Sequence, residues 1–169
     1  MKMYSQICLT VICIFALTFV GCTSKQASFT GEVNGVAFEV DPEFTHAKYN
    51  GSVLTIGATQ MKPYLAGITF FINTNGPGTY LCNEETFAYN NHAHNLAWYN
   101  VIGDPHNRGN NSILYSTNRN NTGTVIITSF DEENKKVSGT FEFRAIRKEG
   151  GSDVVNLKGA FDNVTIEYE

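Results

Sequence analysis

The residues whose types could bind a ligand or a metal ion lie between Asn83 and Thr122. This stretch is rich in asparagine and follows the alternating pattern of β-strands less closely than the rest of the chain. Loops positioned by a rigid β scaffold are where binding residues collect, so we expect any ligand site here. Among the asparagines stand aromatic, imidazole and charged side chains: Tyr89, His92, His94, Trp98, Tyr99, Asp104, His106, Arg108 and Tyr115.

Four of these residues predict a site for a carbohydrate or another polar ligand. Trp98 and Tyr99 could stack on the face of a sugar ring, while Asp104 and Arg108 could hydrogen-bond its hydroxyl groups. Alternation along a strand places Trp98 and Tyr99 on opposite faces. One of the two adjacent aromatic side chains therefore belongs to the core, and packing is the competing interpretation for such residues.

A metal site is the second interpretation of this stretch. His92-Ala93-His94 would put both imidazoles on one face of a strand, with Asp104 or His106 as a third ligand. The spacing resembles the His-x-His of cupins, in which a Glu follows three or four residues later. Asn95 to Trp98 stand there instead. Because that carboxylate is missing, we favour a solvated loop and predict no metal and no other cofactor.

Enzymatic activity is the third interpretation. The sequence contains no nucleophile elbow, no phosphate-binding glycine loop and no His-Glu-x-x-His. The acidic runs Glu84-Glu85 and Asp131-Glu132-Glu133 fall in predicted turns, where solvent surrounds them. Paired acids of the kind that glycosidases use are the alternative that the sequence leaves open. We predict a non-catalytic protein.

The N-terminus predicts export followed by attachment to lipid. Lys2 precedes an apolar run over residues 7–20, which is too short for a transmembrane helix. The run ends at Val20-Gly21-Cys22, which resembles the lipobox of bacterial lipoproteins, with Phe19 where Leu is usual. We expect residues 1–21 to be a signal peptide and Cys22 to carry the acyl chains. An ordinary cleaved signal is the alternative.

The mature chain that this cleavage would leave has the size of one domain. It comprises 148 of the 169 residues, and its formal net charge moves from −4 to −5 with the loss of Lys2. No basic patch is present, so nucleic acid is not an expected partner. The expected partners are the membrane, through the acyl chains on Cys22, and a glycan or another envelope protein. The oligomeric state is left open.

Residues 22–27 predict a short tether between the lipid and the folded domain. The five residues after Cys22 reach at most about 18 Å when fully extended, so the domain must sit close to the bilayer. Acidic residues directly after the cysteine would resemble a surface-export signal, and Thr23 to Ala27 contain none. We therefore expect the periplasmic side of the outer membrane rather than the cell surface.

Cysteine usage agrees with this assignment. Cys8 and Cys13 would leave with the signal peptide, and Cys22 would carry lipid. Cys82 then has no partner for a disulfide. It follows a strand-like run, so we expect a free thiol buried as a small apolar side chain.

Residues 28–169 predict one all-β domain. Short apolar runs alternate with turn residues, and two runs form hairpins: Ser28–Val40 around Asn34-Gly35, and Val154–Tyr168 around Asp162-Asn163. Further strands are expected over 45–49, 52–60, 66–74, 79–82, 96–102 and 113–117. Consecutive strands with short turns predict an antiparallel meander, closed either as a flattened barrel or as a two-sheet sandwich.

The hairpin over residues 123–146 is patterned clearly enough to predict its register. A three-residue loop, 132–134, with Asn134 in the left-handed conformation would pair Asp131 with Lys135 and Ser129 with Val137. The same register pairs Ile127 with Gly139 and Val125 with Phe141. One face is then apolar: Val125, Ile127, Val137, Phe141, Phe143 and Ala145. The other is polar except for Ile126 and Phe130.

Several motifs together resemble those of a known family. They are the lipobox, Phe29-x-Gly31-x-Val33-Asn34-Gly35, Gly76-Pro77-Gly78-Thr79-Tyr80 and, most specifically, the stretch from Gly123 to Phe141. In these the chain, over about residues 29–168, is similar to small Bacteroidota lipoproteins catalogued as a domain of unknown function. The resemblance implies a location in the cell envelope and an all-β domain, and it brings no catalytic residues.

Overall fold

The computed structural model describes residues 26–83, 95–103, 112–120, 122–149 and 151–169. These residues form eleven strands and one short 3₁₀ helix, in the order β1 (Ser28–Val33), β2 (Val36–Glu39), η1 (Pro42–Phe44), β3 (Thr45–Tyr49), β4 (Val53–Gln60), β5 (Leu65–Asn73), β6 (Gly78–Cys82), β7 (Leu96–Gly103), β8 (Ile113–Ser116), β9 (Gly123–Asp131), β10 (Lys136–Arg147) and β11 (Val154–Tyr168). Across these ranges, no helix has the length and apolar character needed to cross a membrane. The all-β prediction is confirmed.

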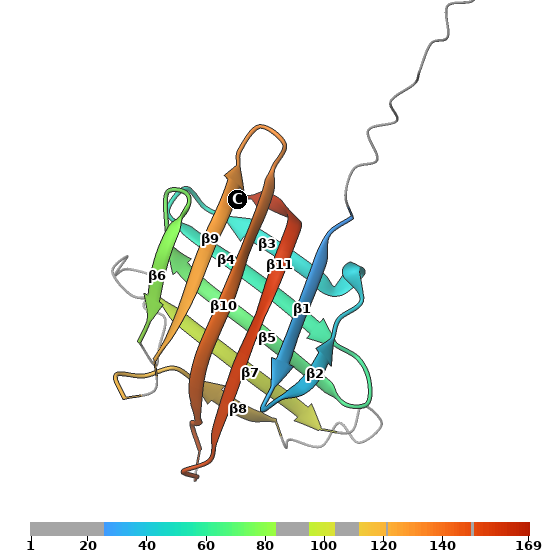
Figure 1. The fold of residues 1–169 in the computed structure, drawn as a ribbon, viewed down its shortest axis with the longest axis vertical. Coiled ribbons are helices and arrows are strands. Elements are labelled where there is room, and N and C mark those ends of the chain that lie inside the picture. The colour runs from blue at the N-terminus through green and yellow to red at the C-terminus, as the bar shows by residue number, and fades with distance from the viewer. Residues whose placement is uncertain (1–25, 84–94, 104–111, 121, 150) are drawn as a thin grey trace, which may run out of the picture.

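The strands lie in two layers that join into a ring. Figure 1 shows β6, β9, β10, β11, β1 and β2 in front and β3, β4, β5, β7 and β8 behind. On one side β8 pairs with the end of β10, where Ser116 lies opposite Ile146. On the other side β11 pairs with β3, where Ile166 lies opposite Ala47. A seven-strand ring is thus closed through β10 and β11, while β1–β2 and β9–β6 extend the front layer at its two ends.

The pairing of β11 with β3 is parallel, whereas the other pairs between the described strands are antiparallel. A parallel neighbour needs a crossover connection rather than a tight turn. Here the crossover is the whole chain between the two strands. The first and last parts of the domain therefore depend on each other, which a simple meander would not require.

The predicted hairpin around Asp162-Asn163 is wrong, because β11 is one continuous strand. Asn163 has a φ of 51°, yet the chain does not turn back there. Instead β11 carries an extra residue opposite β10, which forms a bulge. The hydroxyl oxygen of Ser138 accepts a hydrogen bond from the backbone N–H of Asn163 at 2.9 Å. A left-handed residue within a bulge bends a strand. The bend lets β11 pair with β1 before Asn163 and with β3 after it.

The predicted turn at Asn34-Gly35 is confirmed, whereas the predicted three-residue loop over residues 132–134 is wrong. Asn34 and Gly35, with φ of 50° and 80°, join β1 to β2. At the tip between β9 and β10, however, the loop has four residues and Lys135, not Asn134, is left-handed. The reason is that the Asp131 carboxylate accepts hydrogen bonds from the backbone N–H of Asn134 at 2.9 Å and from its amide at 2.8 Å.

Because the loop is one residue longer than predicted, the strand pairing next to it is shifted by one residue from the predicted register. A bulge between Ser138 and Gly139 restores the predicted register further along the hairpin. Phe130 pairs with Val137 at the tip, and beyond the bulge Ile127 pairs with Gly139 as predicted. A shift of one residue moves a side chain to the opposite face. Phe130, expected on the polar face, therefore packs on the core, with its ring centroid 5.2 Å from that of Tyr49.

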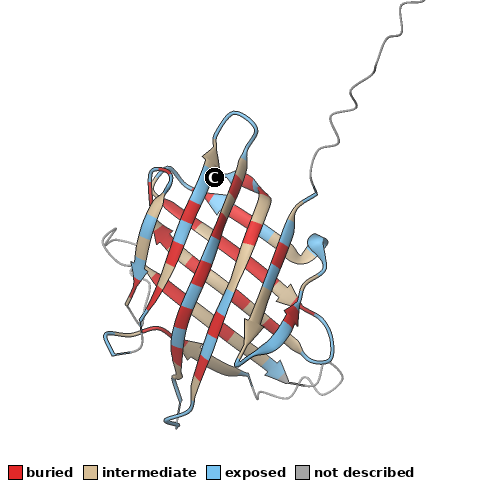
Figure 2. Ribbon diagram, in the orientation of Figure 1, coloured by how far each residue is buried: buried red, intermediate tan, exposed pale blue. Residues whose placement is uncertain are grey.

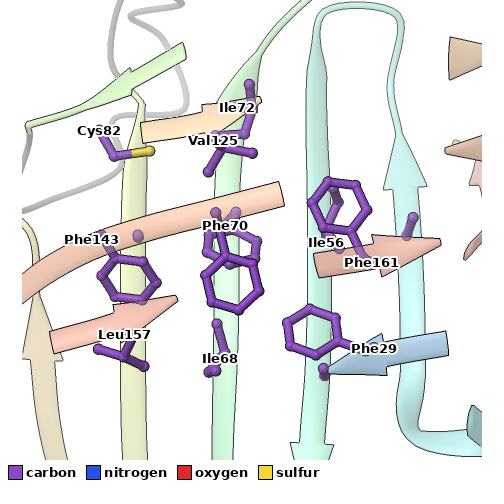
Figure 3. Packing of buried hydrophobic residues seen from close by; sticks show 14 of the residues in the cluster. Phe29, Ile56, Ile68, Phe70, Ile72, Cys82, Val125, Phe143, Leu157 and Phe161 are labelled. Atoms are coloured by element: carbon purple, nitrogen blue, oxygen red, sulfur yellow. The ribbon is translucent and has the colours of Figure 1, made fainter. Parts of the chain in front are cut away.

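Aromatic side chains fill the space between the two layers. Figure 3 shows Phe70 of the back layer at the centre, near rings from the front layer. Its ring centroid lies 4.9 Å from that of Phe141, 5.7 Å from Phe143 and 6.5 Å from Phe161. The predicted inner face of the β9–β10 hairpin is confirmed: Val125, Ile127, Val137, Phe141, Phe143 and Ala145 are all buried. Side chains therefore occupy the interior that a ligand would need.

Candidate functional site

Trp98 and Tyr99 lie on opposite faces of β7, as alternation predicts. Tyr99 is the core member: its side chain is 2% exposed and its ring centroid lies 6.3 Å from that of Phe38. Its hydroxyl oxygen lies 3.5 Å from that of Tyr64. Burial, together with that hydrogen bond, raises the pKa of Tyr99 well above its usual value. Tyr99 therefore packs the interior and leaves Trp98 as the aromatic residue of the pair on the outer face.

Trp98 lies half-buried on the outer face of the back layer. Its ring packs edge-on against Phe71, with the centroids 4.8 Å apart. The indole Nε1 and the side-chain oxygen of Asn100, two residues along the same face, are buried and have no hydrogen-bond partner among the described residues. A buried donor and a buried acceptor without partners are costly. They mark this part of the face as a place where a polar group could bind.

The other predicted ligand residues, Asp104 and Arg108, lie outside the described residues, as do Cys22, Tyr89, His92, His94 and His106. Among the described residues, no group of three or more His, Cys, Asp or Glu side chains could hold a metal ion. His46 is the histidine that the structure places. It stands against the backbone of Gly57, and burial and then the charge of Lys48 lower its pKa.

The outer face of the front layer is hollowed, which sequence reasoning missed. Two adjoining cavities of about 490 and 420 Å³ lie across β9, β10, β11 and β1, and they share Glu32, Thr124, Glu142 and Lys158. We call them together the front trough. Beyond the shared residues, one cavity adds Thr30, Ile126 and Thr140, and the other adds Arg144 and Asn156. Figure 2 shows exposed positions alternating with buried ones along these strands.

Strand register brings the residues of the trough into two rows. In one row Ile126, Thr140, Ala160 and Thr30 lie side by side on successive strands. In the next row Thr124, Glu142, Lys158 and Glu32 do the same, so that a cation stands between two carboxylates. The floor is backbone, at Gly31, Phe141 and Gly159. Ala160, in the middle of the first row, has the smallest side chain of the four.

The charges in the second row are exposed to solvent. Lys158 Nζ lies 3.3 Å from Glu32 Oε2, and the two side chains are 63% and 45% exposed. An exposed ion pair of this kind stabilises a fold by only about 0–1 kcal/mol. The groups of this row are therefore accessible to a ligand. Neither histidine nor cysteine lines the trough.

Cys82 is buried and free, as predicted. Its side chain is 0% exposed, and burial raises the pKa of the thiol to about 12. A thiol that stays protonated is a poor nucleophile and a poor metal ligand. Its role in the described structure is to pack the core.

Comparison with known families gives one match. Residues 25–165 match the model of a family described as a domain of unknown function (DUF6252). No curated protein and no solved structure matches the chain.

Proposed function

Because the chain belongs to the DUF6252 family, whose function is unknown, we propose its role from its own residues. It is a lipid-anchored protein of the bacterial cell envelope, held in the outer membrane through Cys22 and facing the periplasm. Its β domain is a non-catalytic module that binds a polar ligand or an envelope partner on its surface. The N-terminal sequence supports the anchor, and the geometry of the domain supports the mode of binding.

One observation carries the binding proposal: the interior is filled, while the outer face of the front layer is open. Phe70 and the rings around it occupy the space between the layers. The front trough, in contrast, offers hydroxyl, carboxylate, ammonium, guanidinium and amide groups in a small area. A ligand must therefore lie along the outside of the sheet rather than inside it.

The chemistry of the trough favours a neutral ligand with many hydroxyl groups, such as a glycan. Carboxylates accept hydrogen bonds from hydroxyl groups, and Lys and Arg donate to them. The trough covers four strands, about 14 Å across, and about 13 Å from Thr140 to Arg144 along β10. That span fits a chain of two or three sugar rings. Since no aromatic ring is presented to the trough, recognition is by hydrogen bonds rather than stacking.

A second candidate site is the outer face around Trp98, within the region where the sequence predicts binding. The unpartnered Trp98 Nε1 and Asn100 oxygen favour it, because one could donate to a ligand hydroxyl and the other could accept from it. Trp98 and Phe71 would supply the aromatic surface that the front trough lacks.

A single titration distinguishes the two sites, because Trp98 is the only tryptophan and lies on the layer opposite the trough. The chain from Thr23 to Glu169 is screened on a glycan array. Each glycan that binds is then titrated into the protein while the emission of Trp98 is measured. Binding in the trough should leave indole emission unchanged and be lost in Glu142→Ala/Lys158→Ala. Binding near Trp98 should shift the emission and be lost in Asn100→Ala. No binding to any glycan would overturn the proposal of a glycan ligand.

The anchor is tested separately by labelling cells with a palmitate analogue. The wild-type chain should incorporate the label and fractionate with membranes. Cys22→Ala should lose the label. Equal labelling of the two chains would contradict lipidation at Cys22.

A further inference from the structure

The place where the tether joins the domain determines which end of the molecule is closest to lipid. β1 begins at Ser28, which lies opposite Asp162 of β11. In Figure 1 the chain enters at the same end as the tip of the β9–β10 hairpin and the C-terminus. The Asn34-Gly35 turn and the β10–β11 connection lie at the opposite end. The described chain therefore begins at one end of the domain rather than at the side of a layer.

The hairpin tip reaches further in this direction than Ser28 does. The Ser138 hydroxyl lies 3.0 Å from the carboxylate of Asp162, the residue opposite Ser28, so Ser138 and Ser28 stand at about the same level. Three further residues, at about 3.3 Å each, separate Ser138 from Lys135. The tip thus extends about 10 Å beyond the level of Ser28, toward the end from which a tether of at most about 18 Å emerges.

An exposed tyrosine and two lysines, which suit a headgroup region, lie at this end beside the acidic residues Asp131, Glu132 and Glu133. Tyr168 is 44% exposed, and Lys135 Nζ stands 5.8 Å from the centre of its ring. Tyr49 packs against Tyr168 with the centroids 5.9 Å apart, so the ring is held in place. Tyrosine is enriched where membranes meet water, and a lysine can extend its ammonium group past an apolar surface to phosphate.

From the tether and these side chains we propose that the domain stands end-on to the bilayer, with Tyr168 and the 131–136 tip against the lipid headgroups. The inference rests on the proposed lipid anchor at Cys22. The partner of this end of the domain is a lipid surface. The two ends of the front trough then differ: Thr140 and Ile126 lie on the membrane side, while Arg144 and Asn156 lie on the distal side.

The test uses the acylated mature protein, purified from cells and reconstituted into phosphatidylcholine vesicles that contain a nitroxide-headgroup lipid. Two matched reporters, Glu133→Cys and Glu149→Cys, place a bimane label at exposed turns on opposite ends of β10. Wild-type protein, which has neither reporter cysteine, measures the background labelling. This background should be low because Cys82 is buried. Quenching should be at least threefold stronger at position 133 than at 149. Equal quenching, or stronger quenching at 149, would overturn the proposal.

Two further measurements make each result interpretable. In the Glu133→Cys background, Tyr168→Ser should reduce quenching at least twofold, and Tyr168→Phe, which keeps the ring, should preserve it. Unchanged quenching in Tyr168→Ser would overturn the tyrosine contact. Flotation of the vesicles and the mass of acylated Cys22 report on the anchor itself. A protein that is not acylated contradicts the proposed function, whereas one that is acylated and floats without a difference between the reporters contradicts only the orientation.

Discussion

The ring of Phe141 lies against the backbone of Gly159, its partner on the neighbouring strand: a Cβ atom at position 159 would lie 2.6 Å from Phe141 Cζ. Real Cβ atoms do not approach so closely, and the same Cβ would lie 2.1 Å from the backbone oxygen of Thr30, so the neighbouring strand β1 would have to move as well as the ring. The same two residues form part of the floor of the front trough. The packing inside the sheet and the shape of its outside are therefore linked at this pair.

Gly159→Ala should lower the free energy of unfolding by about 1–3 kcal/mol, the usual cost of overpacking a filled site. Urea unfolding of the chain from Thr23 to Glu169 measures it. Gly67→Ala is the matched control, because its Cβ would find its nearest neighbour, Ala58 O, at an ordinary 3.6 Å. That variant should be unchanged or more stable by up to about 1 kcal/mol. Equal losses in both would contradict steric overpacking at Gly159.

Phe70→Ala should be far more damaging than Phe71→Ala. Phe70 is 0% exposed and contacts rings of the front layer, so its truncation should cost about 3–5 kcal/mol. Phe71 is half-buried on the opposite face, where it touches Trp98, and should cost less. Denaturant unfolding gives the two energies, and native tryptophan emission should shift for Phe71→Ala alone. A larger loss of stability in Phe71→Ala than in Phe70→Ala would contradict the assignment of the main core to the face of β5 that carries Phe70.

Asn163→Gly should keep the stability of the protein close to that of the wild type, whereas Asn163→Val should lower it by about 1–2 kcal/mol. The residue has a φ of 51°, which glycine adopts freely and a β-branched side chain does not. Thermal unfolding of the two variants side by side measures the difference. If valine were tolerated as well as glycine, the left-handed bend in β11 would not be needed.

Cys82 predicts a loss of stability in alkali. Burial raises the pKa of its thiol in the folded protein from 9.0 to about 12, so the folded thiol remains protonated while the unfolded thiol ionises. The stabilisation of the folded protein by the protonated Cys82 thiol is complete below pH 9 and is lost as pH rises from 9 toward 12. Between pH 8 and 10 the free energy of unfolding should fall by about 1.4 kcal/mol more in the wild type than in Cys82→Ala. Parallel pH profiles would refute this.

Much of the fold could be predicted because the apolar residues repeat with a period of two. The inner face of the β9–β10 hairpin follows directly from that pattern, as does the core position of one member of the Trp98-Tyr99 pair. The Asn34-Gly35 turn was predictable because the dipeptide itself prefers two left-handed conformations.

Positions that distant contacts decide could not be predicted. Asp162-Asn163 has the composition of a turn, but a left-handed Asn within a bulge has the same composition, and only the pairing with β1, β3 and β10 distinguishes them. At the hairpin tip, the side chain of Asp131 selects the loop length through its bonds to Asn134. The conformational preferences of the individual loop residues do not determine the loop length.

The front trough was missed for a similar reason. Each of its residues, taken alone, belongs to the solvated face of an ordinary strand. Thr30 and Glu32 lie more than a hundred positions from Thr140 and Glu142, and only the register through β11 brings them together. The available signal was the small Ala160, which stands between Thr140 and Thr30 on the outer face. Side chains at Gly31 and Gly159 would point into the core instead, toward Phe141.

The position of β11 in the ring has a consequence for the order in which the molecule can fold. Among the described strands, this one follows the other ten along the chain, yet it pairs with β1, β3 and β10. Until its residues appear, β1 and β3 lack the neighbour that holds them in the ring. Long-range pairings of this kind slow folding and leave strand edges open. The ring must therefore remain open until β11 has been delivered, and closure should then involve the strands on both sides of β11 at once.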